Sequence, residues 1–193
     1  KAQLDSALAA AIKDVKPGEG RERGLALGIL AGKAIVALRS DDGAFQNPIA
    51  EVNNPLEPGL YQGVPPTPIL YAPFWATLPT FALQSPEQFR IAPMPALESE
   101  TYATDFEEVK LKGSKENSTR TAEETSIAKF WYEFSEIGWN RVTATAAADK
   151  NLDLLSTARL FALVNIALAD SYIAGWDSKF HYDFWRPYTA IRA

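Results

Sequence analysis

The 193-residue chain contains no cysteine, which excludes a disulfide scaffold, a zinc site built from thiolates and a cysteine nucleophile. It also lacks an excess of one charge: 19 basic and 24 acidic residues are mixed along the sequence, so nothing indicates a nucleic-acid or anionic-membrane partner. No alternating strand pattern of useful length, internal repeat or low-complexity tract is present. No signal peptide is visible in a chain that opens on Lys1, and the localisation stays open, with export (periplasmic or extracellular) preferred.

What the chain does have is apolar residues in helical register. At 47% hydrophobic residues it can bury a core, and its length fits one domain. We therefore predict an all-α fold, a single helical-bundle domain over residues 1–193 with one long, ordered loop segment rich in proline and aromatic residues. The periodic segments predict helices over residues 2–15, 20–38, 99–112, 121–134, 139–148 and 152–176.

Two of these helices carry features that predict close packing. Gly24, Gly28 and Gly32 form a stripe at every fourth residue, which favours the close approach of a neighbouring helix over a membrane span. Thr121 and Glu124 have the spacing of a capping box, which predicts a helix start, and a buried face is expected after it. That face consists of Ile127, Phe130, Trp131 and Phe134.

The helix over residues 152–176 is the most apolar element. Between Leu154 and Trp176 only Arg159 and Asp170 carry charge. A helix that is apolar nearly all round is expected in the middle of a bundle, and the two charges argue against a membrane span. Asp170 needs a partner or an exposed gap, because a bare buried carboxylate is unfavourable, and the sequence does not identify that partner.

Residues 54–95, which we call the strap, contain ten of the 13 prolines, interleaved with aromatic residues. Proline at this density excludes regular helix, and the aromatic residues exclude a solvated linker. We predict an ordered, extended segment wrapped over the helices. A lid or rim that shapes access to a site is an alternative compatible with this packing role.

The main candidate site lies near the end of the sequence. Lys179 and Arg186 stand seven positions apart, and at about 100° per residue they would point within about 20° of one direction on a single helix. Their side chains could then converge on one anion, Lys179 as a compact charge and Arg186 as a planar fork that matches phosphate-like oxygens. Pro187 disfavours helix at Arg186, so the helix is expected to stop there. A solvated cationic face is the alternative, which the aromatic neighbours disfavour.

Lys179, Arg186 and Pro187 form the motif KxxxxxxRP, and the string WDSKFHYDFWRPYTAIR resembles the haloperoxidase-like branch of a known superfamily. That superfamily joins vanadium-dependent haloperoxidases, bacterial acid phosphatases and type 2 phosphatidic acid phosphatases. The stretch before it also resembles bacterial haloperoxidase-like proteins, so the resemblance spans about residues 60–193. It implies that Lys179 and Arg186 bind the oxygens of vanadate as cofactor, or of phosphate as substrate or inhibitor.

The resemblance also implies what residues 1–193 lack. The family's other motifs, PSGH and SRxxxxxH, supply the histidines of its chemistry and do not occur here. No catalytic residue and no direct metal ligand is therefore assigned, and the chain is expected to be the N-terminal part of such an enzyme, inactive by itself. The C-terminal half of the same enzyme is the expected partner. Without it, apolar helix faces should be exposed, which could also give a homo-oligomer.

Three functions remain open from the sequence. The first is a vanadium-dependent haloperoxidase-like enzyme that uses halide and peroxide. The second is an acid or lipid phosphatase of the same superfamily that hydrolyses phosphate monoesters at the same residues. The third is a non-catalytic helical interaction domain, which predicts that Lys179 and Arg186 are solvent-exposed and splayed apart.

Other residues near the motif are assigned lesser roles. Trp176, one turn before Lys179, is a candidate for lining the site, and Asp183 for holding both cations through helical ion pairs. Arg192 is a candidate for supporting the site. His181 lies about 200° round the helix from Lys179, so it is assigned a structural or surface role. An acidic cluster, interpreted as a solvated helix face because no further ligand joins it at metal spacing, consists of Asp105, Glu107 and Glu108.

Overall fold

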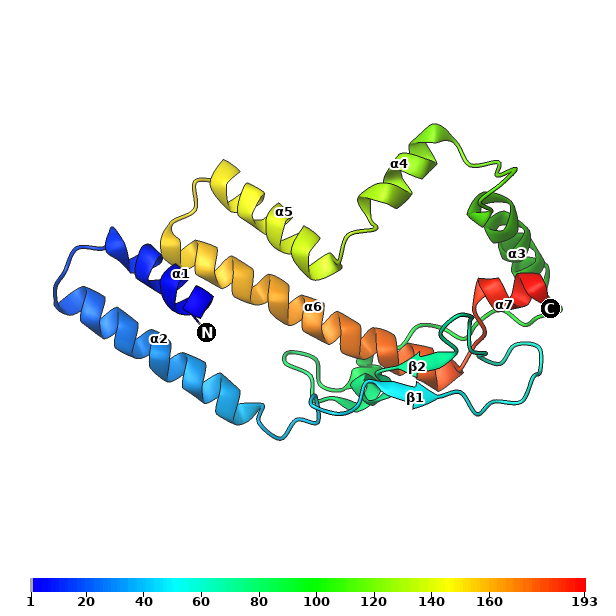
Figure 1. Ribbon diagram of the computed structural model, residues 1–193, viewed down its shortest axis with the longest axis horizontal. Coiled ribbons are helices and arrows are strands. Elements are labelled where there is room, and N and C mark those ends of the chain that lie inside the picture. The colour runs from blue at the N-terminus through cyan, green and yellow to red at the C-terminus, as the bar shows by residue number, and fades with distance from the viewer. Residues whose placement is uncertain (1) are drawn as a thin grey trace. The chain divides into compact units, whose positions relative to one another are not determined.

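The computed structural model describes residues 2–193, whose contacts divide into two compact units between Asp42 and Gly43 (Figure 1). The first unit contains α1 (Ala2–Lys13) and α2 (Glu19–Leu38), close to the predicted helices. The candidate site lies in the second unit. The prediction that the whole chain forms one domain stays a prediction.

The glycine stripe of α2 does not have the close neighbour that we expected. Within its own unit, a Cβ added at Gly24, Gly28 or Gly32 would meet no heavy atom within 4 Å. The prediction of close helix packing at this stripe is therefore wrong for the unit, because α1 does not pack along that face of α2.

The regular structure of the second unit is helical apart from one small two-stranded sheet, which confirms the all-α fold class. In this sheet Ile49 lies opposite Tyr71 across two antiparallel strands of three residues each. The elements of the unit are β1 (Ile49–Glu51), β2 (Ile69–Tyr71), the 3₁₀ turns η1 (Pro73–Thr77) and η2 (Pro86–Phe89), α3 (Glu100–Gly113), α4 (Ala122–Phe130), α5 (Ser135–Asp149), α6 (Leu154–Tyr182) and α7 (Pro187–Arg192).

The capping box at the start of α4 is confirmed. The Thr121 hydroxyl accepts the Glu124 N–H at 3.1 Å, and the Glu124 carboxylate accepts the Thr121 N–H at 2.8 Å. The expected burial of the following apolar face is wrong, because α4 has no extensive packing contact with another described element. The exposed fractions are 51% for Ile127, 60% for Phe130, 61% for Trp131 and 73% for Phe134.

The long helix α6 packs against α5, which lies beside it, and against the two 3₁₀ turns of the strap (Figure 1). The side chains of Asn140 and Asn165 exchange two hydrogen bonds, of 3.1 and 3.0 Å, between the two helices. Further along α6, the Tyr172 hydroxyl donates to the Glu136 carboxylate at 3.1 Å. Polar pairs of this kind fix the register of the two helices, because a shift along the axis would leave them unpaired.

The strap packs on α6 as an ordered segment whose regular structure consists of the strand β2 and two short 3₁₀ turns, which confirms the prediction of an ordered strap. The buried Asp170 carboxylate accepts the backbone N–H groups of Phe81, Ala82 and Leu83 at 2.7, 2.7 and 3.0 Å, which identifies its partners. Two turns later, Asp177 accepts two hydrogen bonds of 2.8 Å from Arg90. These bonds hold the pKa of Asp177 below its ordinary value.

Burial of α6 is incomplete, so the expected place in the middle of a bundle is wrong for the residues that the structure describes. Leu154 and Leu155, at its start, are 85% and 80% exposed. By length and composition alone α6 could cross a membrane, a test that the core helix of a soluble protein also passes. The buried carboxylates of Asp170 and Asp177 have protein partners, as expected of a helix that packs within a protein.

Candidate functional site

The motif lies where α6 ends and the chain turns back. Asp183 adopts the left-handed conformation, with φ 47° and ψ 37°, and its N–H donates to the Lys179 carbonyl at 3.1 Å. The chain then runs extended, so that Phe184 forms a β-bridge with Leu60 of the strap. Arg186 follows as the N-cap of α7, so the prediction that it shares a helix face with Lys179 is wrong.

Both cations nevertheless lie near the aromatic ring of Tyr61. The Lys179 Nζ lies 5.7 Å from the centroid of that ring, and the Arg186 Cζ lies 5.5 Å from it. Arg186 is exposed, as the non-catalytic alternative predicts, whereas Lys179 is half-buried. The turn at Asp183 and the strap place both cations near one ring, and their binding of a shared anion stays a prediction.

Lys179 has an aromatic environment without a counterion. Its Nζ lies 5.2 Å from the ring centroid of Trp176 and 5.0 Å from that of Phe180. Among residues 2–193, neither Lys179 nor Arg186 forms a salt bridge with a carboxylate. Burial lowers the pKa of Lys179, and the charge of Arg186 lowers it further, because both disfavour the protonated amine.

Tyr61 is itself held firmly, at 3% exposure. Its hydroxyl donates to the Ile69 carbonyl at 3.2 Å, and its N–H donates to the Asp183 carbonyl at 2.7 Å. The amide of Asn54 bridges the same two residues: it donates to the Tyr61 carbonyl at 3.1 Å and to the Asp183 carboxylate at 2.6 Å. Asp183 thus binds the strap, and the ion pairs predicted from it to the two cations are not found among the described residues.

The remaining candidate residues differ in whether they contact Lys179. Trp176 lies beside Lys179, and its indole N–H donates to the Tyr71 carbonyl at 3.1 Å, so it could line the site. The Arg192 guanidinium stacks on Tyr188 of its own helix, 4.7 Å from the ring centroid, and no contact brings it to Tyr61. His181 is exposed and packs edge-on against Tyr182, in line with the structural or surface role that we assigned to it.

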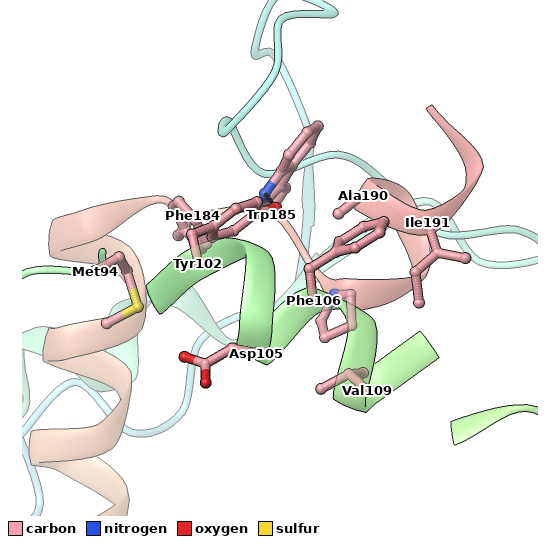
Figure 2. Close-up of a pocket in the computed structure, with 10 residues that line it drawn as sticks. Met94, Tyr102, Asp105, Phe106, Val109, Phe184, Trp185, Ala190 and Ile191 are labelled. Carbon is pink, nitrogen blue, oxygen red and sulfur yellow. Dashed lines mark hydrogen bonds between the residues drawn. The ribbon is translucent and has the colours of Figure 1, made fainter. Parts of the chain in front are cut away.

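Two hollows flank this region. One, of about 560 Å³, has Lys179 and Ser178 in a wall that is otherwise mostly apolar. The other, of about 290 Å³, lies between α3 and α7 and is almost entirely apolar (Figure 2). Phe184 contributes to both hollows, while Asp105 is the only charged residue of the second. Asp105 borders this pocket, and it is exposed together with Glu107 and Glu108, as the predicted solvated helix face requires.

Sequence reasoning missed Tyr61. It stands 118 positions before Lys179 in a segment without helical or strand periodicity, so no spacing rule connects the two. The only available signal was its place among the aromatic residues of the strap, for which we had left open a site-shaping role.

Comparison with known proteins finds similarity to vanadium-dependent peroxidases. The family model "VCPO second helical-bundle domain" matches residues 159–193, which include both cations. Vanadium chloroperoxidase of Curvularia inaequalis is 40% identical over 45 residues, 23% of this chain and 7% of that protein. The crystal structure of a bacterial vanadium-dependent iodoperoxidase matches 99% of this chain with a TM-score of 0.78 and 26% identity. The chain spans about half of that iodoperoxidase, 49% of its length.

Proposed function

We propose that this chain is the vanadate-binding part of a haloperoxidase-like enzyme, because it belongs to the vanadium haloperoxidase superfamily and has part of its fold. Lys179 and Arg186 are the residues to which we assign this binding. The observation that carries the proposal is their convergence on Tyr61 without any carboxylate partner among the described residues. Two neighbouring cations that lack a counterion favour the binding of an anion between them.

The donor set fits a tetrahedral oxyanion. Lys179 offers three N–H donors and a compact charge, while Arg186 offers a planar fork that can bind two oxygens at once. The aromatic rings around Lys179, together with its half-burial, shield its Nζ in part from bulk water, which strengthens its attraction for an anion. In the superfamily, bound vanadate supplies the oxidation of halide by peroxide. The residues of this chain hold and orient the oxyanion and balance its negative charge.

We further propose that residues 1–193 bind the oxyanion without turning substrate over. The family's chemistry depends on histidines, and the one histidine here, His181, is exposed and packed on Tyr182. The remainder of the enzyme, with its histidine motifs, is the proposed partner. Residues 1–193 with vanadate, bromide or iodide, and peroxide should therefore give no halide oxidation, whereas the full-length protein should.

The phosphatase alternative uses the same two residues, because phosphate and vanadate are both tetrahedral oxyanions. Nothing in the geometry of Lys179 and Arg186 favours one over the other. An assay of the full-length protein separates them. Halide oxidation that requires added vanadate supports the haloperoxidase, and phosphate-monoester hydrolysis without vanadate supports the phosphatase.

The binding role is tested by substitution in the full-length protein. Lys179→Met should weaken vanadate binding, measured by equilibrium dialysis, by about 10- to 100-fold, because one charged donor is lost. Lys110→Met is the matched control: Lys110 also lies over an aromatic ring, 5.6 Å from the Phe106 centroid, but it is exposed and paired with Glu107. Unchanged binding in Lys179→Met would contradict the proposed function.

A further inference from the structure

Lys179 and Arg186 repel one another, and yet the protein holds them together without a carboxylate between them. They belong to different elements, Lys179 to the last turn of α6 and Arg186 to the cap of α7. Trp176 and Phe180 contact Lys179 but not Arg186. Tyr61 is the one aromatic residue, among those that the structure describes, whose ring lies near both charges.

We propose that Tyr61 is a positioning residue that holds Lys179 and Arg186 at one place through the face of its ring. This inference rests on the proposed function, since it concerns the same oxyanion site. The π-electrons of an aromatic ring attract a cation within about 6 Å of the centroid, and more strongly where water is excluded. Both cations fall within that range, so one ring offsets part of their mutual repulsion.

The ring can act in this way because the strap fixes it. Its hydroxyl, N–H and carbonyl are bound by Ile69, Asp183 and Asn54 respectively. Two of these three partners, Asn54 and Ile69, belong to the strap, and the third, Asp183, is the turn that separates the two cations. The strap and that turn therefore form one assembly, and the placement of the donors is set before an anion arrives.

The test uses the full-length protein and orthovanadate, with binding measured by equilibrium dialysis. Tyr61→Phe keeps the ring and should bind vanadate nearly as tightly as the natural protein. Tyr61→Leu keeps apolar bulk but has no π face, and should bind about tenfold more weakly. Tyr132→Leu is the control, because Tyr132 is 92% exposed and lies outside the strap in the sequence. It should leave binding unchanged.

A second series separates the π face from packing, in case Tyr61→Leu fails to fold. Starting from Tyr61→Phe, replacement of the ring by 3,4,5-trifluorophenylalanine keeps its shape but removes much of the negative potential of its face. Vanadate affinity should fall while the thermal unfolding temperature stays the same. If the fluorinated and unfluorinated rings bind vanadate equally, the positioning role is overturned. The proposed function then still stands, provided that Lys179→Met has lost vanadate binding. If Lys179→Met binds vanadate normally, both the positioning role of Tyr61 and the proposed function are contradicted.

Discussion

At the scale of single residues, the amine of Lys179 is the most informative group in the site. Its pKa is lowered by burial first and by the charge of Arg186 second. The neutral, nucleophilic amine should therefore form at a lower pH than in an ordinary lysine. An oxyanion bound beside it would act in the opposite direction, because a negative charge favours the protonated form.

We predict that the rate of Lys179 acetylation by acetic anhydride rises with pH, with a midpoint below the pH that is usual for lysine. The rate is measured by mass spectrometry on the full-length protein. Arg186→Met should move the midpoint upward, because the second cause of the lowered pKa is removed. Added orthovanadate should also move it upward or block the reaction. A midpoint that Arg186→Met leaves in place would mean that the two cations do not interact.

At the scale of elements, the strap depends on carboxylates of α6. Asp170 accepts three consecutive backbone N–H groups, and these donors would lose part of their bonding with any neutral replacement. We predict that Asp170→Asn lowers the free energy of unfolding by about 1–3 kcal/mol, measured by urea denaturation of the full-length protein. Hydrogen exchange of the amides of residues 81–83 should rise in the same variant.

The control for this change is Asp149→Asn, at the exposed end of α5. It should change the free energy of unfolding by no more than about 0.5 kcal/mol, as is usual for surface positions. Should Asp170→Asn prove equally harmless, the strap would not depend on this carboxylate for its attachment.

The elements also mark the limit of what the sequence could predict. Helices were found where local signals exist, such as the capping box of Thr121 and Glu124, and the strap was recognised by its prolines. The end of α6 was missed, because its left-handed residue is Asp183 rather than the glycine that usually marks such a turn. A shared helix face of Lys179 and Arg186 was expected and is wrong, and their common neighbour Tyr61 was not expected, because that contact depends on long-range folding of the strap.

At the scale of the whole molecule, large aromatic side chains on α4 and the turn after it are exposed. The side chains of Phe130, Trp131 and Phe134 are each at least 60% exposed, and Trp131 packs only on its neighbours Phe130 and Trp139 among the aromatic residues described. Exposed aromatic clusters of this kind mark interaction surfaces. The bacterial iodoperoxidase that this chain matches over nearly its full length has about as much chain again, since the match covers 49% of it.

We therefore predict that residues 1–193, produced alone, will bind a hydrophobic fluorescent dye and self-associate, and that the full-length protein will do so much less. Light scattering after size-exclusion chromatography measures the association. Replacing Phe130, Trp131 and Phe134 together by serine should reduce both dye binding and association of the fragment, because these residues supply much of the exposed aromatic surface of α4 and the turn after it. A fragment that is monodisperse and binds no dye would show that this surface needs no cover, and would remove the support for a partner at α4.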